Sequence, residues 1–305
     1  RHFGTTRTMV HIGAVLRQLG NLNDAKKYMQ QALEIQNKFY GGKKNFVVAE
    51  TLRNLSTVFR QLGKLNDAKD FAEQALDIQE KHYGKGHVLT AKTLVNLANV
   101  YVDLYKFKEA VEHYERALKI QEHNYGKDNY ATAATLRNIG EVFRCLGSPN
   151  DAKKYLERAL EIQNKYYGDR HILTAKTLVN LGNVYVDLRR FSEAMKCYRQ
   201  ALYIQEKKYN KDNILLVNTL YNLSLLCHQI KEFQLAKTYL LHAKEISINE
   251  AGGQQYLLKI ENLLQRINIE IKATKIPMPL QPLYKNFLEW YYKNNNTKLK
   301  PSFDK

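Results

Sequence analysis

Residues 93–121 read TLVNLANVYVDLYKFKEAVEHYERALKIQ. The first half of this stretch spaces its apolar side chains by three and four positions, as at Leu94, Leu97, Tyr101 and Leu104. That period is typical of an amphipathic helix. The stretch therefore predicts a first helix, here named helix A, followed by a second, named helix B.

Both halves of the stretch recur along the chain at a constant interval. The alanine that opens helix B returns in steps of 43, 42, 42, 42 and 42 residues, at Ala25, Ala68, Ala110, Ala152, Ala194 and Ala236. The phrase Thr-Leu-x-Asn-Leu keeps the same step at 51–55, 93–97, 177–181 and 219–223, with a variant at 135–139 and a degenerate copy at 8–12. Two phrases in register indicate six copies of one helix pair.

Turn residues mark where the helices end. Glycine can adopt a positive φ, so we expect helix A to end at Gly20, Gly63 and Gly147. We expect asparagine N-caps for helix B, at Asn23, Asn66 and Asn150. Tyr-Gly pairs are expected to end helix B, at 83–84, 125–126 and 167–168. Small residues such as Ala25 and Ala32 let helix B approach its neighbours closely.

These residues carry a family resemblance. The series Leu178, Leu181, Gly182 and Tyr185, followed by Ala194, Tyr198 and Ala201, resembles the tetratricopeptide pattern, with leucine in place of the usual tryptophan. The 42-residue length is similar to that of kinesin light chain repeats. The resemblance covers about residues 5 to 250 and implies a fold that binds proteins.

We therefore expect an all-α, right-handed α-solenoid of six helix-turn-helix units with a C-terminal capping helix, because one pair cannot bury its apolar faces alone. The expected repeats occupy residues 1–250, at about 5–42, 46–84, 88–126, 130–168, 172–210 and 214–250. A capping helix is expected at 251–272, and a tail containing prolines and aromatic residues at 273–305. The residues Arg1-His2-Phe3-Gly4 are similar to the end of a helix B at 81–84, although the distance to the next helix is too short. One interpretation is that further repeats once preceded this one.

The sequence contains no run of about 18 apolar residues and no basic-then-apolar secretory signal, so we expect a soluble, intracellular protein in the cytoplasm. Hydrophobic residues make up 44% of the 305 residues and charged residues 25%, which suffices for a buried core. The three cysteines form no Cys-x-x-Cys pair, so neither a disulfide framework nor a zinc site is indicated. The formal charge of +17 leaves nucleic-acid binding as an alternative, although no nucleic-acid module accompanies it.

Helix A supplies the candidate ligand contacts. One asparagine per unit falls on its expected concave face, at Asn54, Asn96, Asn138, Asn180 and Asn222. An amide carries both a donor and an acceptor, so each can pair with a peptide backbone. The alternative is that these asparagines bond only neighbouring helices or solvent. The resemblance favours binding, because kinesin-light-chain-like repeats hold extended cargo peptides with asparagines at the matching place.

Neighbouring positions alternate between units. Units two and four offer arginines, at Arg53, Arg60, Arg137 and Arg144, whereas units three and five offer Lys92, Asn99 and Asp103, then Lys176, Asn183 and Asp187. Arginine grips carboxylates in a bidentate way, so we expect an acidic peptide with a bulky apolar anchor. Residues 87–110 and 171–194 match at 19 of 24 positions, so duplication of an 84-residue pair explains the alternation equally well.

No motif for catalysis, cofactors or metals is present. His87 and His171 recur at one loop position without a catalytic partner, so we expect them at helix starts. Neither a Gly-rich phosphate loop nor a His-Glu-x-x-His sequence occurs. We expect no small-molecule substrate and no membrane insertion.

The tail contains the only tryptophan. Leu288-Glu289-Trp290 resembles the tryptophan-acidic peptides that kinesin light chains bind, although Tyr291, Tyr292 and Lys293 follow where acids are expected. The tail is therefore either a segment that docks in the protein's own groove or a plain packing helix.

Three functions fit the sequence. The leading one is a scaffold or adaptor that binds an extended peptide segment of a partner protein. The alternatives are a sensor or regulatory segment of a larger protein, such as a nucleotide-switch ATPase, and nucleic-acid binding through the basic groove.

Overall fold

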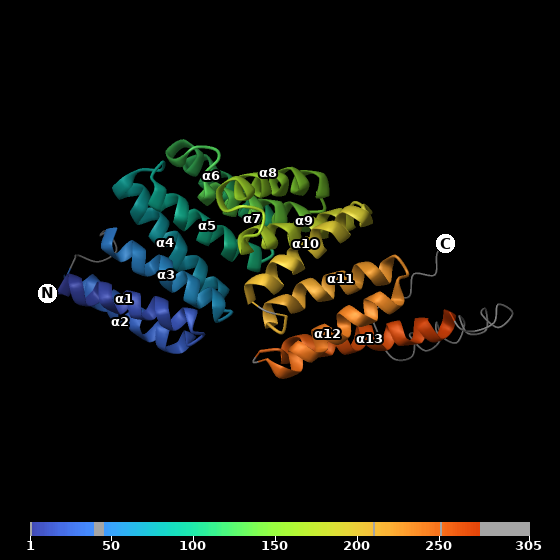
Figure 1. Ribbon diagram of the computed structural model, residues 1–305. Helices are drawn as coiled ribbons and strands as arrows, with labels where there is room; N and C mark the ends of the chain where they lie inside the picture. The colour runs from blue at the N-terminus through green and yellow to red at the C-terminus, as the bar shows by residue number, and fades with distance from the viewer. Residues whose placement is uncertain (1, 40–45, 210, 251, 275–305) are drawn as a thin grey trace. The chain divides into compact units, whose positions relative to one another are not determined.

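The computed structural model describes residues 2–39, 46–209, 211–250 and 252–274. Within these ranges the chain is all-α, with thirteen α-helices and one short 3-10 helix, and no strand occurs there (Figure 1). The expectations for the tail at 275–305, including its short helix and its docking, lie outside the described residues.

The chain divides into two compact units, with the boundary between Leu188 and Arg189. The first unit holds nine helices in its described part: α1 (His2–Gln18), α2 (Leu22–Phe39), α3 (Phe46–Gln61), α4 (Leu65–Tyr83), α5 (Val88–Asp103), α6 (Phe107–Tyr125), α7 (Tyr130–Cys145), α8 (Pro149–Tyr167) and α9 (Ile172–Asp187). Each odd-numbered helix of this unit is a helix A. Helices α1, α3, α5 and α7 each pack against the helix B that follows, and α2, α4, α6 and α8 each pack against the next helix A. This is the stacking that the repeat predicts.

The second unit continues the pattern in its described part. It holds α10 (Phe191–Tyr209), the 3-10 turn η2 (Ile214–Leu216), α11 (Val217–Gln229), α12 (Phe233–Asn249) and α13 (Gln254–Thr274). Helix α13 packs against α12 and buries Ile260, Leu263 and Ile267 in a core shared with α11 and α12. The capping helix expected at 251–272 is therefore present as α13, which covers the last pair.

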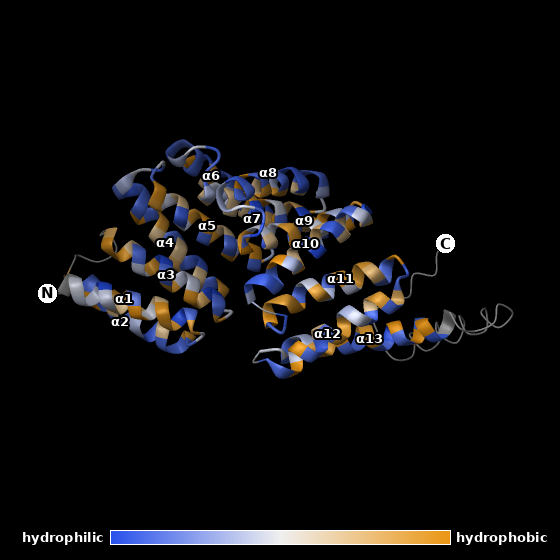
Figure 2. Ribbon diagram, viewed as in Figure 1, coloured by the Kyte–Doolittle hydropathy of each residue, from blue (hydrophilic) through white to orange (hydrophobic). Residues whose placement is uncertain are grey.

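Small residues set the spacing within each pair. The alanine that opens each helix B is fully buried in all six repeats, and so is the alanine seven positions later. In the fourth repeat a Cβ on Gly140 would lie 2.6 Å from Leu156 Cγ and 3.0 Å from the carbonyl oxygen of Ala152. Apolar residues concentrate where helices face one another within a unit (Figure 2).

The expected helix ends are mostly confirmed. Gly63 and Gly147 have φ of 74°, and Gly84, which ends α4, has φ of 85°. The expected asparagine N-caps are wrong, because α2, α4 and α8 begin before Asn23, Asn66 and Asn150.

The cause is the tight turn after helix A. The N–H of Ala68 donates to the carbonyl of Lys64, which makes Lys64 the N-cap of α4. Ser148 occupies the same place before α8, and neither side chain makes a capping hydrogen bond. The interpretation of His2, Phe3 and Gly4 as the end of a helix B is also wrong, since these residues belong to α1, which is a helix A.

Candidate functional site

The asparagines of helix A lie at the surface of each unit and not in its core. Asn54, Asn96, Asn138 and Asn180 lie on α3, α5, α7 and α9 of the first unit, each partly buried. Asn222 lies on α11 of the second unit and is also partly buried. A partly buried amide keeps part of its surface open to a ligand.

Two of these amides join adjacent A helices. Asn96 donates to the hydroxyl of Thr57 at 3.1 Å, and Asn180 donates to the carboxylate of Glu141 at 3.3 Å. The partner lies 39 residues earlier in both cases. A primary amide has two N–H donors and a carbonyl oxygen, so one such bond leaves the second N–H and the oxygen available for a ligand. The packing role of these two side chains is therefore compatible with ligand binding.

Asn99 and Asn138 belong to a polar network under the surface of helix A. The hydroxyl of Tyr114 on α6, only 2% exposed, donates to Asn99 Oδ1 at 2.5 Å. Burial raises the pKa of this hydroxyl, and a hydrogen bond with Asn138 acts in the opposite direction. Arg137 Nη2 in turn donates to Asn138 Oδ1 at 3.3 Å. The network fixes the position of these amides.

Arg53 and Arg137 are arginines whose charge is only partly compensated. Burial lowers the pKa of the Arg53 guanidinium, and the carboxylate of Glu50, 3.7 Å from Nη2, partly offsets this. Burial lowers the pKa of Arg137 as well, with a smaller opposing effect from Glu141. A guanidinium in this setting favours an incoming carboxylate.

The other two arginines are paired within the fold. Arg60 Nη1 lies 2.8 Å from Asp103 Oδ2, and Arg144 Nη1 lies 3.3 Å from Asp187 Oδ2. Each pair joins a helix A to the helix A of the next repeat, and this gives the alternation of arginine and aspartate a packing role. The remaining candidates are Lys92 and Lys176, which are exposed, and Asn183, which is partly buried on α9.

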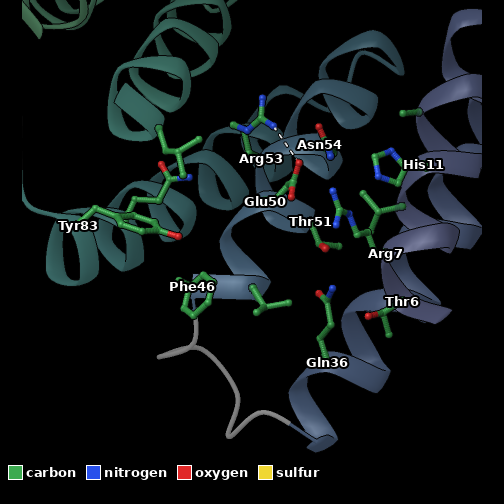
Figure 3. Close-up of a pocket in the computed structure, with 15 residues that line it drawn as sticks. Thr6, Arg7, His11, Gln36, Phe46, Glu50, Thr51, Arg53, Asn54 and Tyr83 are labelled. Carbon is green, nitrogen blue, oxygen red and sulfur yellow. Dashed lines mark ion pairs between the residues drawn. The ribbon is translucent and has the colours of Figure 1, made fainter. Parts of the chain in front are cut away.

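A pocket of about 210 Å³ lies between α1 and α3. Figure 3 shows Arg7 and His11 of α1 facing Thr51 and Asn54 of α3 across it, with Gln36 of α2 below them. The lining also includes Arg53, Phe46 and Tyr83, which add a positive charge and two aromatic rings. Two of the predicted residues, Arg53 and Asn54, are thus brought together here. This cavity is named the α1/α3 pocket.

A second pocket, of about 440 Å³, lies between α5 and α7. It brings together four predicted residues, Arg53, Lys92, Asn96 and Asn138. Tyr125 and Tyr130 add aromatic surface and are 43% and 49% exposed. This cavity is named the α5/α7 pocket, and Arg53 lines both.

Sequence reasoning missed the glutamines of helix B. Gln36, Gln79 and Gln121 line the pockets from below, and each is less than 10% exposed. Gln121 Oε1 accepts from the Thr135 hydroxyl at 2.8 Å. The signal was present in the recurring phrase Ala-Leu-x-Ile-Gln, where a polar residue occupies a position in the apolar series.

The recurring histidines are helix caps, as expected. The Nδ1 atoms of His87 and His171 accept from the backbone N–H groups of Leu89 and Leu173, at 3.2 and 3.3 Å. His87 also stacks on Tyr83, with 4.5 Å between the ring centroids. No cluster of metal-ligating side chains occurs in the described ranges, and none of the helices described there is long and apolar enough to cross a membrane.

These features define an all-α repeat protein with pockets on its A helices. The tetratricopeptide repeat family model matches residues 4–81, 89–165, 132–207 and 173–249. The matches cover most of the chain, so the protein belongs to the tetratricopeptide repeat family. Repeats of this family generally mediate protein–protein interactions and scaffolding. No curated protein matches the chain in sequence at a significant level.

Solved structures share the fold. A putative kinesin light chain from Podosopora anserina with nearly identical TPR-like repeats is 21% identical, with 68% of this chain and 98% of that chain covered and a TM-score of 0.59. BtubC (BKLC) from P. vanneervenii is 22% identical, with 78% and 93% covered and a TM-score of 0.61. The APC/C hetero-tetramer Cut9-Hcn1 is 18% identical, with 88% and 43% covered and a TM-score of 0.64. The chain is similar to kinesin-light-chain-like tetratricopeptide proteins in fold.

Proposed function

We propose that the protein is a scaffold that binds an extended, acidic peptide segment of a partner on the A helices of its first unit. The observation that carries this proposal is the position of Arg53. This partly compensated guanidinium lines two pockets that also contain the predicted asparagines Asn54, Asn96 and Asn138.

The two kinds of side chain have separate tasks. Amides such as Asn96 can accept from and donate to a peptide backbone, which gives affinity with little demand on sequence. Arg53 and Lys92 supply positive charge for acidic side chains, and the pockets supply apolar surface for one bulky side chain. An extended chain rises about 3.3 Å per residue, so asparagines on helices about 10 Å apart meet every third residue.

The test replaces Asn96, Asn138 and Asn180 together with alanine in the full chain. The probe is a set of fluorescein-labelled acidic peptides of about twelve residues, each with one Leu, Phe, Tyr or Trp, which span about 40 Å when extended. Anisotropy is expected to show binding by the unmodified protein and at least about tenfold weaker binding by the triple variant, since each lost amide bond costs about 0.5–1.5 kcal/mol.

The matched control removes three exposed asparagines from B helices, Asn66, Asn150 and Asn164, and is expected to leave the affinity unchanged. Far-UV circular dichroism checks that helicity is preserved in both variants. Equal binding by the two triple variants contradicts the proposal. A salt series separates it from nucleic-acid binding, because phosphate contacts give a steep slope in a plot of log K against log salt.

A further inference from the structure

The two pockets are equivalent sites, two repeats apart. Six residues of the α1/α3 pocket have a counterpart 84 or 85 positions later in the α5/α7 pocket. The matched pairs are Arg7 and Lys92, Val10 and Val95, His11 and Asn96, Gln36 and Gln121, Phe46 and Tyr130, and Thr51 and Thr135. Each pocket thus combines a cation, an aliphatic wall, an aromatic ring at its mouth and a glutamine at its base. The two linings correspond because equivalent positions of the repeat recur two units apart.

Buried glutamine oxygens at the α1/α3 pocket lack a donor. Gln36 is 2% exposed and Gln79 is 3% exposed, and neither Oε1 has a hydrogen-bond partner among the described residues. A buried acceptor without a donor costs about 1–3 kcal/mol, and a ligand that brings a donor recovers this. The counterpart Gln121 Oε1 already accepts from the Thr135 hydroxyl, so the α5/α7 pocket does not require a hydrogen-bond donor from the ligand.

Arg53 lies between the two sites, because it lines both. Its Nη2 atom is 3.7 Å from Glu50 Oε1, which is longer than a good charge-assisted hydrogen bond. The counterpart of Glu50 in the α5/α7 pocket is Ala134, so the second site carries no carboxylate at this position. A carboxylate that arrives between the sites can therefore make a better bond to Arg53 than Glu50 does.

The spacing of the sites follows from helix packing. Two repeats place equivalent A helices about 20 Å apart, if each step is about 10 Å, and an extended chain covers this in about six residues. We propose that the first unit reads a two-anchor motif: an aromatic side chain ending in a hydrogen-bond donor for the α1/α3 pocket, an apolar side chain about six residues away for the α5/α7 pocket, and an acidic residue between them for Arg53. This inference rests on the proposed function, since it specifies the sequence that the same surface selects.

Two linked anchors bind more tightly than either alone when the linker matches the distance between the sites. The second contact is then intramolecular and adds a factor of roughly 100 or more in affinity, which is lost when the linker is too short. Affinity is therefore expected to peak at one anchor spacing, whereas a single pocket gives no such peak.

The probes are fluorescein-labelled synthetic peptides with Tyr, a central Glu and Leu in an otherwise Ser- and Asp-containing chain, in which the anchors are about two, four, six, eight or ten residues apart. The spacing of about six is expected to bind at least about tenfold more tightly than two or ten. Replacing Tyr by Phe is expected to weaken binding about tenfold, because the glutamine oxygen stays unpaired. Moving the Glu outside the anchors is expected to weaken binding as well.

Tryptophan at two equivalent positions blocks the pockets one at a time. Glu50 and Ala134 are both exposed residues on the pocket linings, so E50W and A134W fill one pocket each with little cost to the core. Each single variant is expected to reduce the affinity of the best peptide to that of a single-anchor peptide and to abolish the dependence on spacing. The variant E50A controls for loss of the carboxylate and is expected to keep the dependence.

The outcomes separate this inference from the function on which it rests. Binding that is sensitive to the asparagine triple variant but independent of anchor spacing and of both tryptophans overturns the two-anchor motif and leaves the proposed function in place. Absence of binding by every peptide overturns both.

Discussion

Arg60 of α3 donates from Nη1 to Asp103 Oδ2 of α5 at 2.8 Å, and so joins the helix A of one repeat to that of the next. Arg144 and Asp187 repeat the relationship 84 residues later. The side chains of Arg60 and Asp103 are 30% and 37% exposed, so their Coulomb attraction is partly screened by solvent. Both pairs lie outside the lining of the two pockets, so we expect them to contribute to packing between repeats.

A double-mutant cycle on Arg60 and Asp103 is therefore expected to give a coupling of about 0.2–1 kcal/mol in the free energy of unfolding, measured by urea denaturation. The more exposed pair Lys81 and Asp77 on α4 is the control and is expected to give less. Peptide affinity is expected to change little in Arg60→Ala, in contrast to Arg53→Ala. A large loss of affinity in Arg60→Ala would show that this arginine contacts the ligand instead.

Replacing Tyr105, which has a positive φ, by glycine is expected to stabilise the protein. Tyr105 has φ of 58° at the position where Gly63 and Gly147 end helix A in other repeats, and its side chain is 82% exposed. A left-handed conformation costs a non-glycine residue about 1–2 kcal/mol, partly offset by the greater freedom of glycine in the unfolded chain. Tyr105→Gly is expected to raise Tm in a thermal melt, and Gly147→Tyr to lower it. A lower Tm for Tyr105→Gly contradicts this reading.

The sequence predicted the helices well because their signals are local. The apolar spacing of three and four involves residues within one or two helical turns of each other. The same holds for the glycines at the helix ends, such as Gly63 and Gly84. The N-caps of helix B were predicted wrongly because Gly63 and Lys64 form so tight a turn that Asn66 already lies inside α4. The true N-cap, Lys64, lies two residues before Asn66, and the helical period does not distinguish between these two positions.

The candidate site was predicted less completely because its contacts cross repeats. The asparagine positions follow from the helical period, but the pairing of Arg60 with Asp103 joins residues 43 positions apart, which periodicity does not reveal. The role of Gln36 was hidden for a different reason. A glutamine in an apolar series predicts burial, whereas the lack of a partner for its oxygen depends on the position of Thr51 and its neighbours in space.

Any side chain at Gly140 is expected to destabilise the protein while Leu156 is present, because the two positions face each other. Since an added Cβ would lie 2.6 Å from Leu156 Cγ, Gly140→Ser forces helices α7 and α8 apart and is expected to cost about 1–3 kcal/mol. The second repeat solves the same contact with Ser56 and Ala72 at the equivalent positions, both fully buried.

The double variant G140S/L156A copies that solution into the fourth repeat. It is expected to be more stable than the sum of the two single changes predicts, because the small residue at 156 makes room for the serine. Urea denaturation of the four proteins measures this coupling, and strict additivity would refute the close contact. Leu156→Ala alone is expected to cost about 2–5 kcal/mol.

Cys145 and Cys227 are expected to react at very different rates with a thiol reagent. Cys145 is exposed at the end of α7, whereas Cys227 is fully buried on α11. Burial raises the pKa of the Cys227 thiol to about 11, and it also raises the pKa of Cys145, against which Arg144 acts. In a Cys197→Ser background at pH 8, the fast phase with a disulfide reagent is expected to come from Cys145 alone. Because the pKa of Cys145 is raised, the rate of this phase is expected to keep rising at pH values above the ordinary thiol pKa.

The raised pKa of Cys227 also fixes the sign of a stability change. Its folded-state pKa lies above the ordinary thiol value of 9.0, so the unfolded state loses this proton first as the pH rises. The contribution to stability is fully present below about pH 9 and declines towards pH 11. Cys227→Ala removes this contribution, so the decline in Tm between those values is expected to be shallower in the variant. An equal or steeper decline contradicts the assignment, and Cys145→Ala is the control.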